Sequence, residues 1–195
     1  MKGYHYIKRG IDIILSGMAI VILSPLLLFL CIAIKLDTPG PILFKQKRIG
    51  IHRSFFQIYK FRTMRIDTPK DVPTHMLENP EQYITKVGKF LRKTSLDELP
   101  QIFNIFKGEM SIVGPRPALW NQDDLVAERE KYGANDVTPG LTGWAQINGR
   151  DELEIPDKAR LDGEYVKHLG PWMDLKCFLG TIGSVLMHDL SLIHI

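Results

Sequence analysis

Asp97 and Glu98 form an adjacent carboxylate pair in the segment Ser95-Leu96-Asp97-Glu98-Leu99-Pro100. Such a pair can supply a nucleophile, a metal ligand or an acid/base group. It also has a structural interpretation, because first-turn acids stabilise the positive end of a helix and Ser95 with Glu98 matches a capping box. A helix capped at Ser95, however, would place Pro100 at its fifth residue, where the ring clashes with the preceding turn. We therefore expect the helix to begin at Asp97 or later, which leaves Glu98 available for chemistry.

Three basic side chains lie in segments that suit anion binding. Lys60 and Arg62 are two positions apart on an expected strand, so both point to one face, among aromatic residues. If this segment is buried, its charges need an anionic partner such as phosphate. If it is an edge strand, the two basic side chains can instead form a face exposed to solvent. Arg116 stands between two prolines, which limits the entropy lost when its guanidinium binds a phosphate.

A glycine-flanked segment at residues 144–148 is a further candidate. We expect a strand there, with Trp144, Gln146 and Asn148 on one face and Arg150 directly after it. Such a face either forms a ligand-binding wall that offers ring stacking and amide hydrogen bonds, or packs on the core. Gln146 and Arg150 are accordingly candidate substrate ligands.

The elements that must position these residues follow from hydrophobic pattern and turn residues. Strands are predicted at residues 42–48, 55–64, 110–113 and 144–148, and helices at residues 84–93, from about 97 to 106, 123–132, 157–169 and 175–187. The first two strands are predicted to form a hairpin around Gly50, and residues 66–81 are expected to be a surface loop. The last helix is amphipathic and suits either a membrane interface or the core. The fold class expected is α/β of the α+β type, with helices packed on short strands.

An apolar run from Ile11 to Ile34 carries one charge, Asp12, and is interrupted by Ser24-Pro25. About 20 apolar residues can cross a bilayer as a helix. Basic residues flank both ends of the run, so the positive-inside rule places both flanks in the cytoplasm. A re-entrant helix that breaks at Pro25 satisfies this bias and is favoured over a single kinked span and over a signal peptide. The expected division is a membrane anchor at residues 1–37 and a cytosolic catalytic domain at residues 38–195.

Composition excludes several classes of protein. The net charge of +3 and the charged fraction of 24 % do not indicate nucleic-acid binding. The two cysteines lack a CxxC spacing and indicate reduced thiols, and the six histidines form no HxxxH or HExxH pattern for zinc.

Nearly the whole chain carries longer blocks in a fixed order: the anchor with Ser24-Pro25, then Pro39-Gly40-Pro41, KFRTM at residues 60–64, RKTSLDELPQ at 92–101, GEMSIVGPRP at 108–117 and PGLTG at 139–143. These blocks resemble the bacterial sugar transferases, the monotopic phosphoglycosyl transferases. The length of 195 residues resembles the minimal catalytic form of that family, without an added transmembrane bundle.

This resemblance implies transfer of a sugar 1-phosphate from a UDP-sugar to undecaprenyl or another polyprenyl phosphate, with release of UMP. The step would initiate biosynthesis of a surface polysaccharide such as a capsule, at the cytoplasmic face of the bacterial inner membrane. By motif position, Asp97 would be the nucleophile that forms a covalent phosphosugar intermediate, and Glu98 a metal ligand and acid/base partner. Lys60, Arg62, Arg92 and Arg116 would neutralise the phosphates together with Mg²⁺, which Asp97 and Glu98 would hold.

One alternative from another class is a membrane-anchored module that binds polyprenyl phosphate or phospholipid without catalysis. The acid pair disfavours it, because two carboxylates beside a cationic pocket repel an anionic ligand. The sequence leaves open which UDP-sugar is used and whether the chain forms a homo-oligomer.

Overall fold

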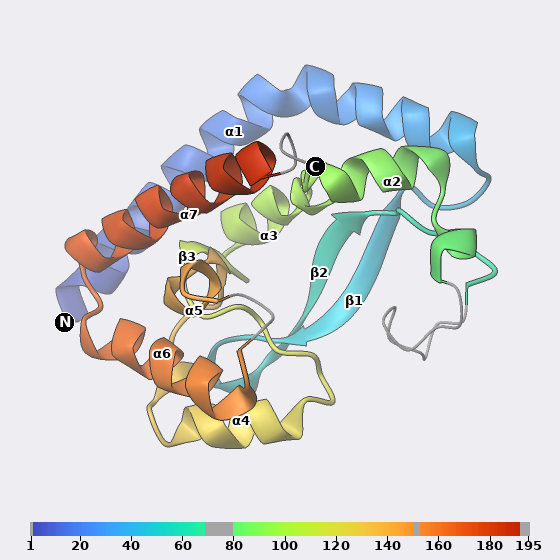
Figure 1. The fold of residues 1–195 in the computed structure, drawn as a ribbon. Coiled ribbons are helices and arrows are strands. Elements are labelled where there is room, and N and C mark those ends of the chain that lie inside the picture. Colours follow the sequence, from blue (N-terminus) through green and yellow to red (C-terminus); the bar gives the residue numbers. More distant parts are fainter. Residues whose placement is uncertain (1, 69–79, 150–152, 192–195) are drawn as a thin grey trace. The chain divides into compact units, whose positions relative to one another are not determined.

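The computed structural model describes residues 2–68, 80–149 and 153–191 (Figure 1). Most of the surface loop predicted at residues 66–81, and the candidate ligand Arg150, lie outside these ranges. The chain divides into two compact units. The first unit comprises Met1–Leu15, Lys47–Gln57 and Ile105–Ile195, and the second comprises Ser16–Gln46 and Ile58–Asn104. The mixture of helices and short strands agrees with the predicted fold class.

Helix α1, Lys2–Asp37, contains the apolar run and continues through Pro25 without interruption. The predicted helix break is therefore absent, and the hydrogen bond of Ser24 gives the physical reason. Pro25 has no N–H to donate to the carbonyl of Val21, and the hydroxyl of Ser24 donates to that carbonyl instead, at 2.8 Å. The helix is drawn as one ribbon in Figure 1.

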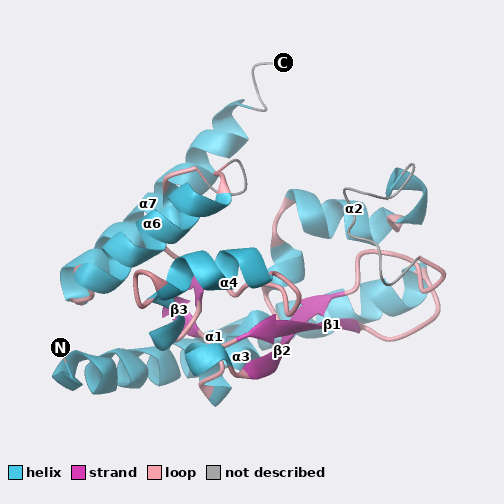
Figure 2. Ribbon diagram, turned by 90° about the horizontal axis from the view of Figure 1, so that it is seen from below, coloured by secondary structure: helices cyan, strands magenta, loops and turns pink. Residues whose placement is uncertain are grey.

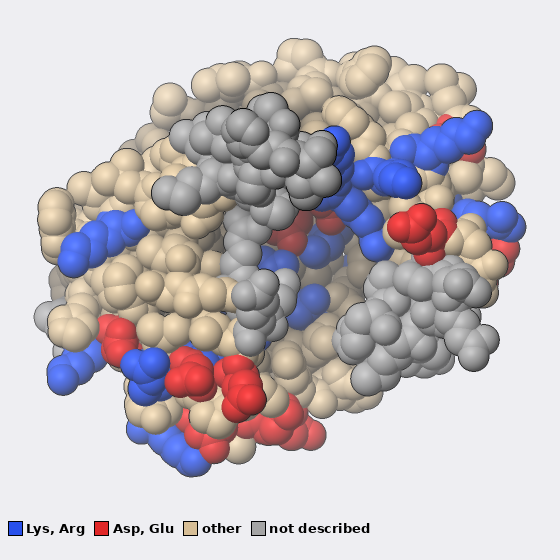
Figure 3. Space-filling model, viewed as in Figure 1, with Lys and Arg blue, Asp and Glu red and all other residues tan. Residues whose placement is uncertain are grey.

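By length and composition, α1 is able to cross a membrane over Gly3–Asp37. Only 11 % of its most apolar window is buried. Figure 3 shows the upper edge of the molecule, where α1 runs in Figure 1, almost without charged side chains. The predicted apolar N-terminal helix is thus confirmed as an element with an exposed apolar surface.

The β-hairpin predicted around Gly50 is present, with strands β1, Leu43–Ile49, and β2, Phe55–Phe61 (Figure 2). The second unit continues with helix α2, Lys86–Lys93, and the short 3-10 helix η4, Leu96–Glu98. Helix α3, Gln101–Lys107, follows directly. A core of Leu30, Ile34, Phe61 and Leu91 joins α1, β2 and α2 in this unit.

The first unit contains a two-stranded parallel sheet of β3, Ser111–Val113, and β4, Gly140–Thr142, with Ser111 opposite Gly140. Its helices are α4, Asp123–Glu130, α5, Trp144–Ile147, α6, Ile155–Lys167, and α7, Pro171–Ser191. Val113, Tyr165, Met173 and Cys177 form one buried cluster, and Ala118, Leu125 and Ala159 form another.

Strand β4 begins at Gly140, where two backbones approach closely: a Cβ there would lie 2.1 Å from the backbone nitrogen of Gly114. One local prediction in the first unit is wrong. The strand expected at residues 144–148 is helix α5. The amide side chain of Asn148 donates to the carbonyl of Trp144 at 2.8 Å, which satisfies a free carbonyl at the end of this helix.

Candidate active site

The acid pair lies in η4, between α2 and α3. Ser95 precedes η4 with φ of 56°, in the left-handed region, and its side chain makes no capping hydrogen bond. The capping-box interpretation therefore does not apply. The α-helix after the pair begins only at Gln101, as expected from Pro100. A single 3-10 turn thus presents Asp97 and Glu98, outside the α-helices on either side.

Strand β2 brings Lys60 to the acid pair from a distant part of the sequence. The Lys60 ammonium donates to Oε1 of Glu98 at 2.7 Å, and both side chains are largely buried, with 19 % and 23 % of their surfaces exposed. An ion pair of this kind is screened less than a surface pair. The predicted grouping of Lys60 with the carboxylates is therefore present.

Asp97 is half-buried, and burial raises the pKa of its carboxyl group above the ordinary value. The positive charges of Lys60 and Arg92 oppose this shift, whereas the neighbouring charge of Glu98 adds to it. The carboxylate therefore sits in a partly desolvated position between two cations. Loss of water around a carboxylate leaves it less stabilised and more ready to react with a phosphorus centre.

Arg92, near the end of α2, is the second cation of this group. Its Nε donates to Oγ1 of Thr63 at 2.9 Å, which fixes the plane of the guanidinium. Burial lowers its pKa, and the charge of Asp97 opposes that shift. Lys60, Arg92, Asp97 and Glu98 all belong to the second unit and form its charged cluster.

The guanidinium of Arg62 donates hydrogen bonds to the segment that follows α1. Arg62 is 6 % exposed, and its two Nη atoms donate to the carbonyls of Pro39, at 2.6 Å, and Thr38, at 2.8 Å. Strand β2 ends at Phe61, so Arg62 lies just beyond the strand on which it was expected. These bonds satisfy carbonyls that follow the end of a helix.

The remaining candidates, Arg116 and Gln146, belong to the first unit. Pro115 and Pro117 are buried and Arg116 is half-buried, as expected for an arginine held between two fixed prolines. Both amide atoms of Gln146 are buried without a hydrogen-bond partner among the described residues. A buried amide without partners costs free energy unless a ligand or water pairs with it.

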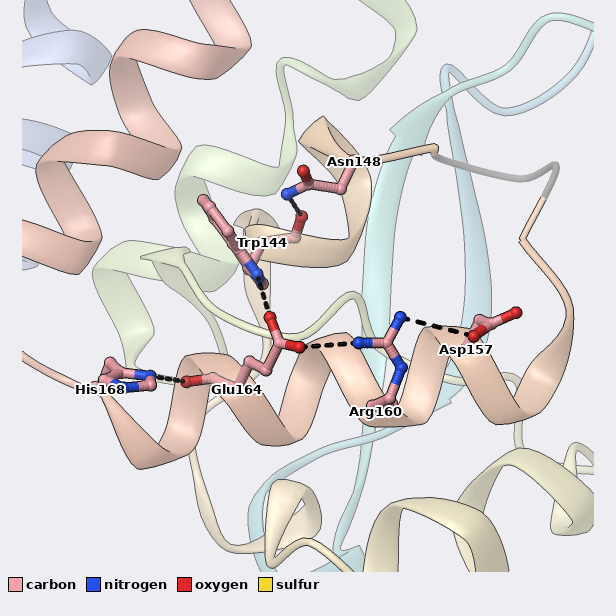
Figure 4. Close-up of polar contacts among 6 residues, drawn as sticks. All are labelled: Trp144, Asn148, Asp157, Arg160, Glu164 and His168. Carbon is pink, nitrogen blue, oxygen red and sulfur yellow. Dashed lines mark hydrogen bonds and ion pairs between the residues drawn. The ribbon is translucent and has the colours of Figure 1, made fainter.

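The side chain of Trp144 forms a hydrogen bond within its own unit. Its indole nitrogen donates to Oε2 of Glu164 at 3.0 Å, while Oε1 of Glu164 accepts from Arg160 at 2.8 Å (Figure 4). Figure 4 also shows Asn148 turned back to the carbonyl of Trp144. The shared strand face expected for residues 144–148 does not exist, because these residues form a helix.

Sequence reasoning missed Asn104, a supporting residue of the site. Asn104 is fully buried, and its Oδ1 accepts from the backbone N–H of Tyr59 at 3.0 Å. The contact fixes α3, which follows the acid pair, to the strand residue next to Lys60. A polar residue between the apolar pairs Ile102-Phe103 and Ile105-Phe106 was the available signal.

Among the described residues, no three His, Cys, Asp or Glu side chains are grouped so as to hold a metal ion. The acid pair alone offers two carboxylates. Mg²⁺ commonly binds through one or two carboxylates together with substrate phosphates and water, so this donor set fits Mg²⁺ when a phosphate substrate is present.

Comparison with known proteins shows the family of the chain. The sequence profile described as bacterial sugar transferase matches residues 3–188. The chain belongs to this family. It is 40 % identical over 189 residues to the UDP-glucose:undecaprenyl-phosphate glucose-1-phosphate transferase of Escherichia coli (strain K12), covering 90 % of this chain and 39 % of that protein.

Two further relatives differ in length and description. One is the UDP-N-acetylgalactosamine-undecaprenyl-phosphate N-acetylgalactosaminephosphotransferase of Aeromonas hydrophila, 38 % identical over 94 % of this chain and 44 % of that protein. Another is an uncharacterised sugar transferase of Bacillus subtilis (strain 168), 38 % identical over 94 % of this chain and 89 % of that protein. The chain thus spans less than half the length of the first two relatives.

Proposed function

We propose that this sugar transferase moves a sugar 1-phosphate from a UDP-sugar to polyprenyl phosphate and releases UMP, as the first step of a surface glycan. The half-buried Asp97, next to Glu98 and flanked by Lys60 and Arg92, is the observation that carries the proposal. Relatives that match about 90 % of the chain are named for sugar phosphate transfer to undecaprenyl phosphate.

In the proposed reaction, a carboxylate oxygen of Asp97 attacks the phosphorus that bears the sugar, and the bond from that phosphorus to the UMP oxygen breaks. A phosphate oxygen of the polyprenyl phosphate then attacks the same phosphorus and frees Asp97. Lys60 and Arg92 reduce the repulsion between the carboxylate and the anionic phosphates. Two steps let the soluble nucleotide sugar and the lipid use one site in turn.

Mg²⁺ is the proposed ion, and when bound it would neutralise phosphate charge beside the carboxylates of Asp97 and Glu98. Arg116, Gln146 and Arg150 are the proposed substrate ligands outside the charged cluster. The buried, unpartnered amide of Gln146 supports its assignment, since a substrate group would satisfy it. Arg62 contributes indirectly, through the segment after α1 that its hydrogen bonds hold.

The N-terminal end of α1 supports a re-entrant topology at the cytoplasmic face of the membrane. Arg9 donates to the carbonyls of Ile105 and Phe106, and the carboxylate of Asp12, 4 % exposed, accepts from the N–H of Ile112 at 3.0 Å. These groups hold the start of the helix to folded polypeptide. The single charge in the apolar run is thereby paired with protein rather than placed in lipid.

The C-terminal end of α1 is held in the same manner. Asp37 accepts from the N–H of Val87 at 3.0 Å, and Arg62 binds the two carbonyls that follow. Each end of α1 is tied to the folded chain of its own unit, and basic residues lie outside both ends. This charge pattern supports entry and exit by one face, with the change of direction proposed at Pro25, where the helix continues but lacks a backbone N–H. Helix α7 also exposes Trp172, Leu175, Leu179 and Ile182, which suits an interfacial helix.

A panel of UDP-sugars, assayed for UMP release with Mg²⁺ and stoichiometric detergent-solubilised protein, tests the proposal. We expect UMP from one or a few sugars without acceptor lipid, and a polyprenyl diphosphate sugar after the lipid is added. Binding of polyprenyl phosphate without UMP release from any UDP-sugar would instead support the non-catalytic membrane module.

A further inference from the structure

An apolar cavity of about 620 Å³ lies within the second unit. It is lined by side chains of α1, the start of β1, the end of β2 and α3, among them Leu27, Cys31, Leu43, Phe61 and Phe103. Its size falls within the range of small-molecule sites, about 300–1,000 Å³. An apolar cavity of this size, in a protein with an exposed apolar helix, suits an apolar ligand.

The cavity adjoins the segments that carry the charged cluster. Pro100, one of its lining residues, is two positions after Glu98. Phe61, another, directly follows Lys60, whose ammonium bonds to Glu98. A ligand in the cavity therefore lies against the same two pieces of backbone that hold the acid pair.

The charge at the cavity indicates the kind of ligand. Lys45 is the charged residue among those that line it, and its side chain is exposed, with Nζ 5.6 Å from the ring centre of Tyr59. An apolar cavity with a cation at its edge complements an amphiphile that has an anionic head and an apolar tail. The α1 wall belongs to the segment able to cross a membrane, so such a ligand enters from the lipid phase.

We propose that this cavity binds the isoprene units next to the phosphate of the polyprenyl phosphate acceptor. The inference rests on the proposed function and adds the place where the acceptor chain is recognised. The cavity takes only the first few units, and the rest of the chain stays in the bilayer. A diacyl phospholipid fits less well, because it brings two chains from one head group to a single cavity.

The first experiment fills the cavity. Leu27→Trp adds bulk to its α1 wall, whereas Ile22→Trp adds the same bulk at a site on α1 that is 68 % exposed and does not line the cavity. With vesicle-reconstituted protein, Leu27→Trp is expected to raise the KM for polyprenyl phosphate at least tenfold. Its affinity for UDP-sugar should match that of Ile22→Trp. Equal KM values for polyprenyl phosphate in the two variants would overturn the proposal.

The second experiment needs no substitution and no turnover. Cys31 is half-buried and lines the cavity, whereas Cys177 is fully buried, with 0 % of its surface exposed, and is closed to the reagent. N-ethylmaleimide should therefore label Cys31 in phosphatidylcholine nanodiscs. Farnesyl phosphate, with three isoprene units, should slow this labelling several-fold, whereas inorganic phosphate should not.

Equal protection by phosphatidic acid, or no protection by farnesyl phosphate, would contradict the assignment of the cavity to the acceptor chain. A failure of the proposed function has a different signature. The wild-type protein would then release no UMP from any UDP-sugar, whatever the labelling of Cys31 shows.

Discussion

At the scale of single residues, the proposed nucleophile Asp97 carries its charge in a position that the folded protein disfavours. Asp97 is kept between Lys60 and Arg92, yet burial still raises its pKa. A charged group that the folded protein disfavours lowers stability while it serves chemistry. Substitutions of Asp97 and Lys60 can separate these two effects.

Asp97→Asn is expected to abolish UMP release and raise the melting temperature at neutral pH. The raised pKa means that the folded state binds the proton of Asp97 more tightly than the unfolded state. The stability that this confers is present at low pH and is lost as pH rises through the folded-state pKa. The variant should thus melt above the wild type at pH 7, and the gap should close below the ordinary value of 3.8.

Asp67→Asn is the control, because the pKa of Asp67 is shifted in the opposite direction from that of Asp97. Hydrogen bonds from Arg65 lower the pKa of the exposed Asp67. It should leave turnover unchanged and give no stabilisation. Full UMP release by Asp97→Asn, or an adduct mapped by mass spectrometry to another residue, would show that the nucleophile is assigned wrongly.

Lys60→Ala is expected to reduce turnover at least tenfold, since one charge-assisted contact contributes about 1.5–3 kcal/mol. Lys60 also lowers the pKa of Asp97, so its loss should move the acid limb of the pH–rate profile to higher pH. Lys89→Ala removes an exposed lysine of α2 and is the matched control. A reduced rate with an unshifted profile would argue against the electrostatic role of Lys60.

At the scale of elements, α1 combines an apolar surface with two polar ends held by protein. Asp12 is tied to Ile112 and Asp37 to Val87, so the carboxylates near each end of α1 are paired with protein and not with the exposed apolar stretch between them. In the middle, Ser24 repairs the hydrogen bond that Pro25 cannot make. The helix therefore tolerates its proline in an apolar environment.

Single cysteines at the two ends of α1 test the re-entrant topology. Tyr6 and Leu36 are each 83 % exposed, so Tyr6→Cys and Leu36→Cys should present reactive thiols in a Cys31→Ser background. We expect an impermeant maleimide to label neither in intact cells and both in permeabilised cells. Labelling of just one of them from outside would establish a spanning helix.

The Ser24–Pro25 pair should behave as a coupled unit. Ser24→Ala leaves the carbonyl of Val21 without a partner and should lower the melting temperature in detergent by a few degrees. In a Pro25→Ala background, a backbone N–H again reaches that carbonyl, so the same change should have little effect. Additive effects in this double-mutant cycle would contradict the proposed repair.

At the scale of the whole molecule, a buried ion pair supports the first unit. Arg129 of α4 and Asp162 of α6 are 4 % and 1 % exposed, with Nη2 and Oδ2 2.6 Å apart. Neither residue belongs to the charged cluster around Asp97. The pair links two helices that also share the core of Leu125 and Ala159.

Arg129→Met is expected to lower the free energy of unfolding by about 3–5 kcal/mol, because it leaves a buried carboxylate unpaired. The double variant Arg129→Met/Asp162→Leu should recover most of this loss, since it removes both charges. Denaturant or thermal unfolding in detergent measures both. If the double variant is no more stable than Arg129→Met, the lost free energy of unfolding comes from the packing of the arginine side chain and not from an unpaired carboxylate.

The sequence alone determined the features that depend on local pattern. Hydrophobic pattern, turn residues and proline geometry predicted the long apolar helix α1, the hairpin around Gly50 and a helix that begins at Asp97 or later. The motif blocks also identified the family, which the profile over residues 3–188 confirms.

The tertiary structure decided which distant groups meet. Lys60 and Glu98 are 38 positions apart, and Asn104 accepts from a strand residue 45 positions earlier, so local pattern does not identify the partner in either contact. The segment at residues 144–147 is helical although its alternation suggested a strand. Local pattern reports which face of an element is apolar, whereas partners across the fold are chosen by packing and by the need to satisfy buried polar groups.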